Sequence, residues 1–384
     1  MNAAADAIYL DHNATTPVAD QVIEAMRQAL QNLWANPSSS HAAGRDVRRA
    51  IGKAREDVAN LLGCLPSEII FTSGGTESDN LALLGVARAR RRVGRRVVIS
   101  AVEHPAVEAA CAVLAAEGFQ ITRVAVATDG RVSAEAFAEA LTPETAVASL
   151  MHANNETGTL QPVREVSQAA RARSIPLHSD AAQSVGKIPV DIGDLGVDLL
   201  TVAGHKLYGP KGVGALYVRS GVPIAPVLVG APQENGLRPG TENTPGIVGL
   251  AAACRLAARE GEERVRHERS LAAHLLEKLV QAFPGLEING PVDPGLRLPN
   301  TLNVSLPGVR ADRLLAALEG LALSSGAACH AGNPAPSGVL MAMGLEKERA
   351  LGALRLSVGR GNTHPEMDQA AARIGHAARI ALNS

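Results

Sequence analysis

The sequence predicts an α/β fold built on a largely parallel sheet. Short apolar runs of strand length alternate with longer segments of helical periodicity through the first two thirds of the chain. Several of these runs end in turns rich in glycine or polar residues that lead directly into a helix. The length of 384 residues exceeds what one hydrophobic core usually supports, so we expect two domains.

The predicted elements follow one another in a regular order. An extended segment at 8–10 precedes helical periodicity at 19–33 and 44–62. A strand at 68–71 then leads through a Gly-Gly turn into a helix that begins near Glu77. Further strands are predicted before His104, at 146–151, before Asp180, at 198–203 and just after Lys206. The second of these units repeats the first, because Pro105 opens a helix directly after His104.

Polar side chains follow five of these strands at the points where the strands end. In chain order the five ends carry Gly75 and Thr76, His104, Asn155, Asp180 and Gln183, and His205 and Lys206. Ligand sites of open parallel sheets lie outside the carboxyl ends of the strands, so we expect these groups to converge.

The groups at the strand ends have a specific combined chemistry. Apolar walls around Lys206 would lower the pKa of its amine toward the range in which a lysine forms a Schiff base with an aldehyde. Free N–H groups at the helix start after Gly75, with the hydroxyl of Thr76, would suit a phosphate. A buried carboxylate such as Asp180 needs a cationic partner, which a protonated pyridine nitrogen would provide. His104 could stack on an aromatic ring and move protons.

Each of these groups also has an ordinary structural interpretation. Lys206 could be a surface lysine, Thr76 the cap of a strand-to-helix turn and His104 a structural histidine. Their joint occurrence favours a pyridoxal 5'-phosphate site.

The C-terminal part predicts a long helix at 246–283 that links the domains, with a solvated face over the mixed-charge run at 260–270. A strand at 300–305, a helix at 311–318 and a short strand at 321–323 follow. The segment SSGAACHAGNPAPSG then has the composition of a surface loop, with Cys329 in its middle. A loop thiol is either incidental or reactive. Arg355 lies in an alternating strand, where it is either a surface arginine or a clamp for a carboxylate.

Composition excludes several functional classes. A formal net charge of −1 with interspersed acids and bases argues against a nucleic-acid or polybasic membrane surface. The absence of a basic, then apolar, N-terminal pattern and of long apolar runs indicates a cytoplasmic protein. The four cysteines show neither disulfide nor zinc spacing, so no metal site is indicated. Cys64, Cys111 and Cys254 lie in helical contexts typical of small buried groups.

The chain resembles the cysteine desulfurases, NifS/IscS-like members of the class V aminotransferase superfamily, and is also similar to selenocysteine lyases. The matching runs are YLDHNATTP, NPSSSHAAGR, FTSGGTESDN, VEHPAV, ANNETG, HSDAAQSVGK, GHKLYGPKGVGALYVR, RPGTENTP, SSGAACHAG and LRLSVGR. The resemblance implies a homodimer of the fold type I of pyridoxal-phosphate enzymes. It implies a large domain at 16–261 with a mainly parallel seven-stranded sheet. A smaller α+β domain would comprise 1–15 and 262–384 and carry the catalytic-cysteine loop at about 324–338.

The resemblance also assigns roles to individual residues. Catalysis would use Lys206, His104 and Cys329, with Lys206 carrying the cofactor. The cofactor would also contact Gly75, Thr76, His104, Asn155, Asp180, Gln183 and His205, and Thr241 would reach the phosphate of the neighbouring subunit. The substrate would contact Arg355, Asn155 and Asn13. Two positions depart from the family pattern, because Ala203 replaces a common phosphate-binding serine and His12 replaces a tyrosine, which we interpret as a local packing change.

The implied activity converts L-cysteine to L-alanine and transfers the sulfur to Cys329 as a persulfide. An acceptor protein, such as an iron–sulfur scaffold or a component of a thiolation pathway, would then take the sulfur. A selenocysteine lyase acting on L-selenocysteine is the nearer alternative, toward which Ala203 and the sequence ACH at 328–330 lean. A non-catalytic dimeric scaffold of the same fold is the more distant one.

Overall fold

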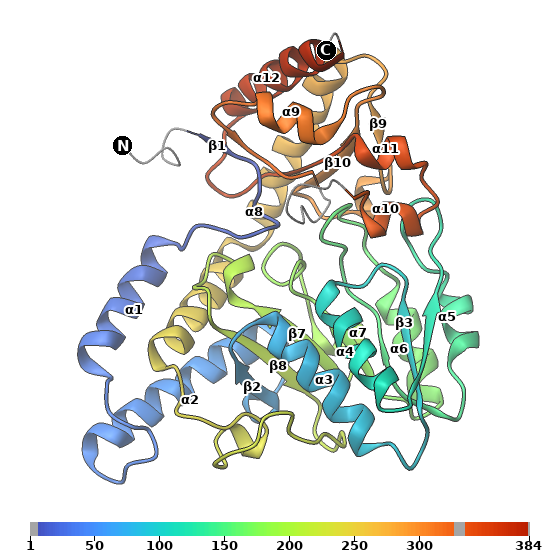
Figure 1. Ribbon diagram of the computed structural model, residues 1–384. Coiled ribbons are helices and arrows are strands. Elements are labelled where there is room, and N and C mark those ends of the chain that lie inside the picture. Colours follow the sequence, from blue (N-terminus) through green and yellow to red (C-terminus); the bar gives the residue numbers. More distant parts are fainter. Residues whose placement is uncertain (1–6, 326–334, 383–384) are drawn as a thin grey trace.

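A computed structural model describes residues 7–325 and 335–382 and shows two lobes of unequal size (Figure 1). The larger lobe is built around a central sheet with helices on both faces. The smaller lobe contains β1 (Ile8–Tyr9) as well as the C-terminal elements, so segments from both ends of the chain share it.

The central sheet of the larger lobe has seven strands, as predicted. In spatial order they are β2 (Ile69–Thr72), β8 (Gly214–Val218), β7 (Leu199–Ala203), β6 (Leu177–Asp180), β5 (Thr145–Ser149), β3 (Arg96–Ser100) and β4 (Gln120–Val124). Strand β8 pairs antiparallel with both of its neighbours, whereas the pairs from β7 to β4 are all parallel. The predicted mainly parallel α/β class is therefore confirmed, with β8 as the antiparallel strand.

Helices cover both faces of this sheet, so its strands are apolar along their whole length. Val97 and Ile99 of β3 pack with the helices α3 (Gly75–Ala89) and α4 (Pro105–Ala116), and Val98 between them packs in the core on the opposite face. That opposite core includes residues of α1 (Asp20–Asn32), α2 (Ala42–Leu62), α5 (Ala134–Ala140), α6 (Val163–Ala172) and α7 (Ile192–Leu195).

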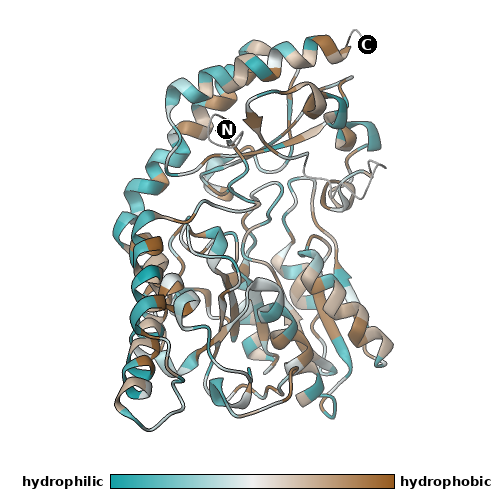
Figure 2. Ribbon diagram, turned by 60° about the vertical axis from the view of Figure 1, so that its left-hand side comes forward, coloured by the Kyte–Doolittle hydropathy of each residue, from teal (hydrophilic) through white to brown (hydrophobic). Residues whose placement is uncertain are grey.

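The smaller lobe has an antiparallel sheet in the order β12 (Ala353–Ser357), β10 (Thr301–Ser305) and β9 (Glu287–Ile288). Strand β1 pairs in parallel with β11 (Leu321–Ala322). Its helices are α9 (Ala311–Ala317), α10 (Gly338–Ala342), α11 (Lys347–Leu351) and α12 (His364–Leu382). Along α12, Figure 2 shows hydrophilic and hydrophobic residues in alternation, as expected of a helix with one buried side. The 3-10 helices are η1 (Pro66–Glu68), η2 (Gly204–Lys206), η3 (Glu234–Gly236) and η4 (Pro294–Leu296).

Helix α8 (Thr244–Ala282) runs from one lobe to the other. Leu250 packs in the larger lobe and Leu271 in the smaller lobe, and the helix is broken between them at Gly261, with φ 36° and ψ −122°. A positive φ of this kind favours glycine. Ile8 and Leu10 pack in the same core as Leu271. These contacts support the proposed division of the chain at residues 15/16 and 261/262.

The prediction that residues 260–270 form a solvated helix face is wrong for two of them. Arg264 and Glu268 are buried, and their side chains lie 3.8 Å apart. Glu262, Glu263, Arg266 and Arg269 of this run are exposed, whereas the side of the helix with Arg264 and Glu268 faces the interior. Within the described ranges no helix is both long and apolar enough to cross a membrane.

Candidate active site

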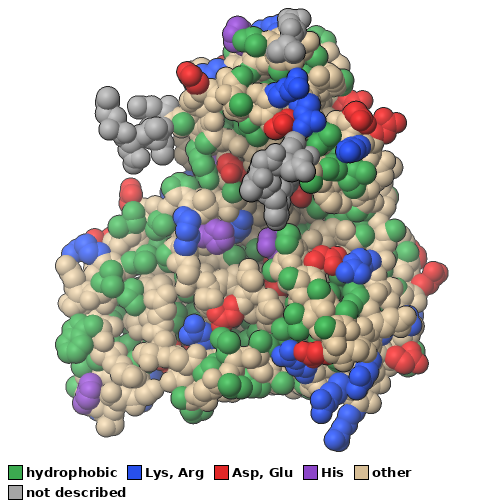
Figure 3. Space-filling view, viewed as in Figure 1, with side chains coloured by type: hydrophobic (Ala, Val, Ile, Leu, Met, Phe, Trp, Pro, Cys, Tyr) green, Lys and Arg blue, Asp and Glu red, His purple; other side chains and the backbone are tan. Residues whose placement is uncertain are grey.

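The five polar strand ends lie around one cavity of about 340 Å³ at the carboxyl edge of the sheet. It is lined by Asn13, Ala14, Gly75, Thr76, Asp79, His104, Met151, Asn155, Asp180, Ala182, Gln183, Ala203, His205, Lys206 and Arg355. Asn13 and Arg355 come from segments that pack in the smaller lobe, so the cavity lies where the lobes meet. Figure 3 shows histidine and basic side chains on the surface where the two lobes meet.

Lys206 lies in η2, directly after β7, and its amine is held close to the backbone. Its Nζ donates to the carbonyl oxygens of Asn13 at 2.5 Å and Ala14 at 2.7 Å. Burial, reinforced by the nearby Arg355 cation, lowers the pKa of Lys206 to about 8. A shift of this size makes the neutral, nucleophilic amine roughly 300-fold more abundant at neutral pH.

Gly204 allows the tight approach of η2 to the following segment. A Cβ at this position would lie 2.9 Å from the carbonyl oxygen of Val213 and 3.1 Å from that of Pro210. Glycine is therefore required for the backbone to bring Lys206 into the cavity.

Asp180 and His104 are neighbouring ionisable residues on one side of the cavity. Asp180 is buried at the end of β6, and Ala182 N donates to its Oδ1 at 2.9 Å. Burial raises the pKa of Asp180, and the adjacent His104 and Lys206 act against this rise. His104 caps α4, because its Nδ1 accepts from Ala106 N at 3.2 Å. Burial lowers the pKa of His104, so the neutral ring carries its proton on Nε2.

Arg355 brings a guanidinium from β12 into the cavity. Its Nη2 donates to Asp11 Oδ1 at 2.7 Å and its Nη1 to the carbonyl oxygen of Asn155 at 3.2 Å. The buried Nε has no hydrogen-bond partner among the described residues. A ligand carboxylate could therefore bind here if it satisfied Nε and shared or displaced the contact with Asp11.

Asn13 lines the cavity, yet its side chain is occupied by the protein. Its Nδ2 donates to Thr301 Oγ1 at 2.9 Å and to the carbonyl oxygen of Asn155 at 3.3 Å. Its Oδ1 accepts from Lys187 at 2.8 Å and from Asn300 at 3.1 Å. These four bonds use the full capacity of the amide. A contact between this side chain and a substrate, which the resemblance implied, would require one of them to break.

The start of α3 provides a cup for an anion. The first backbone N–H groups of this helix follow Gly74 and Gly75, and Gly74 supplies no capping side chain. Ala203 closes the cup from behind, since a Cβ on Gly75 would lie 3.5 Å from Ala203 Cβ. His205 lines the same cavity, and burial, with the charge of Lys206, lowers its pKa to about 4. The ring of His205 is therefore neutral at pH 7.

Comparison with known proteins assigns the family. Residues 8–370 match the family model described as aminotransferase class-V. The chain belongs to the aminotransferase class-V family. It is 43% identical over 370 residues to the putative cysteine desulfurase IscS 1 of Bacillus subtilis, covering 96% of this chain and 97% of that protein. It is also 43% identical to the cysteine desulfurase IscS of Methanosarcina thermophila, with 94% and 90% covered.

Solved structures agree with this family membership. A NifS-like protein superposes with a TM-score of 0.91 at 38% identity, covering 97% of this chain and 100% of that one. SspA in complex with cysteine superposes with a TM-score of 0.80 at 36% identity, with 91% and 98% covered. The resemblance to the NifS/IscS-like members of the family is therefore confirmed, together with the fold class.

One departure from the family pattern has a local explanation. His12 is buried, and its ring centre lies 4.9 Å from that of Tyr9 and 6.0 Å from that of Tyr208. A Cβ on Gly359 would overlap the His12 ring, so this histidine packs against a glycine. Burial lowers the pKa of His12 to about 4, which indicates a neutral ring. The interpretation of His12 as a packing change agrees with these contacts.

Sequence reasoning missed Asp79, which lies on α3 and lines the cavity. It is 1% exposed, and its Oδ1 has no hydrogen-bond partner among the described residues. Burial, reinforced by the negative charge of Asp180, raises the pKa of Asp79 well above its usual value. One ligand atom each of Asp79, Asp180 and His104 lies within 4.8 Å of the others. The available signal was the helical spacing, because a residue three positions after Thr76 shares its face of α3.

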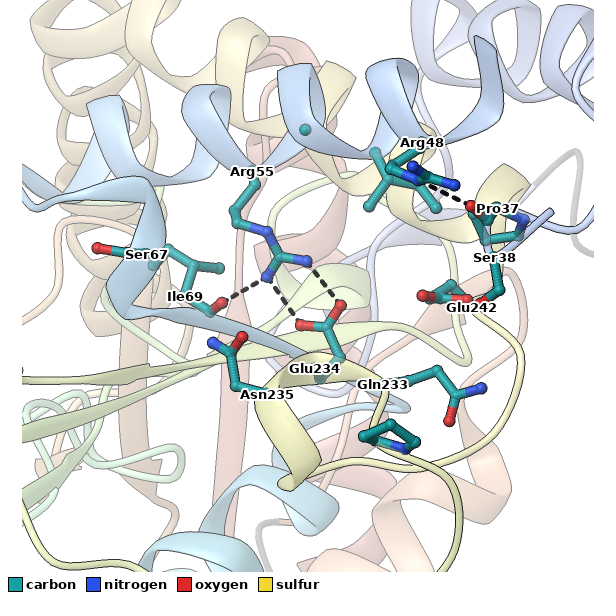
Figure 4. A pocket seen from close by; sticks show the side chains of 13 residues that line it. Pro37, Ser38, Arg48, Arg55, Ser67, Ile69, Gln233, Glu234, Asn235 and Glu242 are labelled. Atoms are coloured by element: carbon teal, nitrogen blue, oxygen red, sulfur yellow. Dashed lines mark hydrogen bonds and ion pairs between the residues drawn. The ribbon is translucent and has the colours of Figure 1, made fainter. Parts of the chain in front are cut away.

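The structure places Thr241 on the exposed surface, outside the described lining of the cavity. The loop before Thr241 is held by Glu234, whose carboxylate accepts from Arg55 at 2.6 and 2.7 Å (Figure 4). It also accepts from Phe71 N at 2.8 Å. Glu234 and Asn235 have φ values of 46° and 59°, which non-glycine residues rarely adopt. This ion pair therefore holds the loop in a conformation that it would otherwise avoid.

Cys329 lies outside the described residues, as does most of its predicted loop. The residues on either side of this gap adjoin the cavity. Ser324 exchanges backbone hydrogen bonds with Arg355, and Ser337 Oγ donates to Glu156, which follows the cavity residue Asn155. Cys111 and Cys254 are buried and Cys64 is half-buried, and burial raises the pKa of all three to about 12. These three thiols are therefore protonated and poorly nucleophilic.

Proposed function

We propose that the protein is a pyridoxal-phosphate-dependent cysteine desulfurase. The curated relatives named above carry this activity in their names and are aligned over nearly the whole chain. The observation that carries the proposal is the cavity, where the Lys206 amine, with its lowered pKa, lies together with Asp180, His104 and Arg355.

The residues of the cavity fit this cofactor. The unpartnered Oδ1 of Asp79 and the buried Asp180 suit a protonated ring nitrogen, and the N-terminus of α3 suits a phosphate. We assign Lys206 to covalent attachment, Asp180 to the ring nitrogen, Gln183 to the ring oxygen and His104 to the ring face. Gly75, Thr76 and His205 would hold the phosphate, and Asn155 would contact the cofactor and the substrate. When bound, the cofactor supplies an electron sink for the carbanion that forms at the substrate Cα.

The remaining steps follow from the side chains of the chain itself. Arg355 binds the substrate carboxylate through parallel N–H donors. The neutral amine of Lys206 removes the proton from Cα, and the ring of His104 accepts the proton of the substrate thiol at Nδ1, which then gives up its hydrogen bond from Ala106 N. The Cys329 thiolate attacks the substrate sulfur, so an S–S bond forms as the C–S bond breaks. One L-cysteine and one enzyme thiol thereby give one L-alanine and one enzyme persulfide, without an external oxidant.

Two partners are part of the proposal. The exposed position of Thr241 supports a homodimer in which this residue reaches the phosphate of the partner's cofactor. An acceptor protein, such as an iron–sulfur scaffold or a thiolation protein, would collect the persulfide sulfur.

A selenocysteine lyase is the second candidate, because Ala203 leaves the anion cup without a serine hydroxyl at that position. Turnover of L-cysteine and L-selenocysteine by the same preparation separates the two activities. Faster turnover of L-selenocysteine with no persulfide on Cys329 would favour the lyase.

The decisive experiment follows Cys329 by mass spectrometry after the cofactor-loaded protein meets L-cysteine. A gain of one sulfur atom on the peptide with Cys329, together with alanine, is expected. Cys329→Ala should keep the visible absorbance of the lysine-bound cofactor and lose persulfide formation. Cys64→Ala is the matched control and should behave like the wild type, because that thiol is half-buried and protonated. Undiminished alanine production by Cys329→Ala would contradict the proposal.

A further inference from the structure

Lys187 is a buried lysine beside the candidate active site to which the proposed mechanism gives no role. It lies in the turns that follow β6 and is 5% exposed. Its Nζ donates to Gln183 Oε1 at 2.6 Å and to Asn13 Oδ1 at 2.8 Å. Burial, reinforced by the charge of Lys206, lowers the pKa of Lys187 well below its usual value, so the neutral amine that donates these two hydrogen bonds is favoured.

The charged neighbours of Lys187 do not take its hydrogen bonds. Glu268 of α8 is buried, and burial raises its pKa to about 7, with Arg264 and Lys187 acting against the rise. Within the described residues, Glu268 forms its ion pair with Arg264. The amine of Lys187 instead donates to two neutral amides, one from each lobe.

These bonds determine which way the amide of Gln183 points. The other end of the Gln183 amide faces the backbone carbonyl oxygen of Asn13, which can only accept, so the atom that meets Lys187 is the carbonyl oxygen of Gln183. The amide nitrogen is therefore turned away from Lys187, and it donates to the carbonyl oxygen of Asn13 at 2.9 Å. Gln183 also lines the cavity, so the end that remains available for a ligand is a hydrogen-bond donor.

We propose that Lys187 is a positioning residue that holds Gln183 with its remaining N–H directed to the cofactor's ring oxygen. This inference rests on the proposed function, which assigns Gln183 to that oxygen. A phenolate-like oxygen accepts hydrogen bonds, so a reversed amide would bring two acceptors together. The same amine, through its hydrogen bond to Asn13, ties the N-terminal segment of the smaller lobe to the larger one.

The test is a double-mutant cycle of Lys187→Met, Gln183→Leu and the combined variant. The readouts are the dissociation constant of pyridoxal phosphate and the pH titration of the visible absorbance of the lysine-bound cofactor. Gln183→Leu should weaken cofactor binding about tenfold, as expected for one hydrogen bond to a charged group, and should shift the titration. Lys187→Met should produce a similar change, and the double variant should add little to either. Lys53→Met, a change at an exposed lysine of α2, is the control and should match the wild type.

The outcomes separate this inference from the proposed function. A wild type that gains no visible absorbance with pyridoxal phosphate would overturn the proposed function itself. A coloured wild type with effects of Lys187→Met and Gln183→Leu that simply add, or with an unchanged Lys187→Met, would overturn the role of Lys187 alone. If Lys187→Met does not fold, Lys187→Ala, which also removes the donor to Gln183, takes its place in the cycle. A non-additive change is again expected, and additivity would again contradict the proposal.

Discussion

At the residue scale, burial dominates the chemistry of the cavity. It is the largest influence on Lys206, lowering the pKa of the amine, and on Asp180 and Asp79, raising the pKa of both carboxyls. Each shift favours the neutral form. Lys206 therefore presents a neutral, nucleophilic amine to the cavity. A cation that binds beside Asp180 and Asp79 would stabilise the charged form of these carboxyls.

Replacement of the lysine tests its role directly. Lys206→Ala should lose the visible absorbance of the lysine-bound cofactor, and alanine production should fall by roughly 100-fold or more because the general base is gone. Absorbance spectra and alanine assays of the cofactor-loaded protein provide the measurement. Lys347→Ala, at an exposed lysine of α11, is the control. Retention of the visible band by Lys206→Ala would mean that another amine carries the cofactor.

The raised pKa of Asp79 predicts how the free energy of unfolding depends on pH. Its folded-state pKa is raised, so its contribution to stability is present below the unfolded pKa of about 4 and is lost as pH rises through the folded pKa. Asp79→Asn removes this loss. Relative to the wild type, the cofactor-free variant should therefore gain free energy of unfolding as the pH rises from 4 to 8. Urea unfolding at both pH values measures this, with Asp46→Asn at an exposed site as control. Wild-type and Asp79→Asn stabilities that change in parallel would refute the prediction.

At the scale of elements, glycines determine where the backbone can bend. Gly261 breaks α8 between its two packed halves, and Gly204 lets η2 pass close to the next segment. The break in α8 brings Arg264 and Glu268 into the interior near Lys187, although their sequence pattern predicted exposure.

Two alanine substitutions should have opposite effects on stability. Gly261→Ala places a Cβ on a residue with positive φ and should lower the free energy of unfolding by about 1–2 kcal/mol. Gly52→Ala, within the regular helix α2 and with open space around a Cβ, should raise it by about 0.5–1 kcal/mol. Chemical denaturation of both variants is the measurement. Stabilisation by Gly261→Ala would show that α8 does not need this break.

At the scale of the whole molecule, the cavity belongs to neither lobe alone. The strand ends of the larger lobe form one wall, and Asn13 and Arg355, from segments of the smaller lobe, form another. In the homodimer proposed above, Thr241 of a second copy would complete the site; this residue is exposed, and Arg55 and Glu234 hold the loop before it on the outside of the larger lobe.

Mixed dimers test whether Thr241 of a second copy completes the site. Thr241→Val should weaken cofactor binding about tenfold by removing a hydroxyl from the phosphate, and Thr241→Ser should not. A dimer of one Lys206→Ala chain and one Thr241→Val chain retains one site with both Lys206 and Thr241. That site should bind the cofactor as tightly as the wild type, measured by titration of the purified mixed dimer. Affinity equal to that of the Thr241→Val homodimer would show that Thr241 acts within its own chain.

Much of the arrangement could be predicted from local sequence. The alternation of strands and helices indicated the parallel sheet, and its five polar strand ends do share one cavity. This worked because strand exits of a parallel sheet share one edge, whatever the helices between them contain. The prediction of a solvated face at 260–270 was wrong for Arg264 and Glu268, because charge composition alone does not show which side of a helix meets a second lobe.

The sequence by itself determined the fold class and the set of reactive groups, because periodicity and turn residues act over a few neighbouring positions. Only the tertiary structure decided how those groups are protonated and held. The amide of Asn13 is used up by residues as distant in sequence as Lys187 and Asn300, and Asp79 is left with a buried oxygen that has no hydrogen-bond partner within the described part of the chain. Burial and hydrogen-bond partners depend on packing between segments that are far apart in the chain, which no local pattern records.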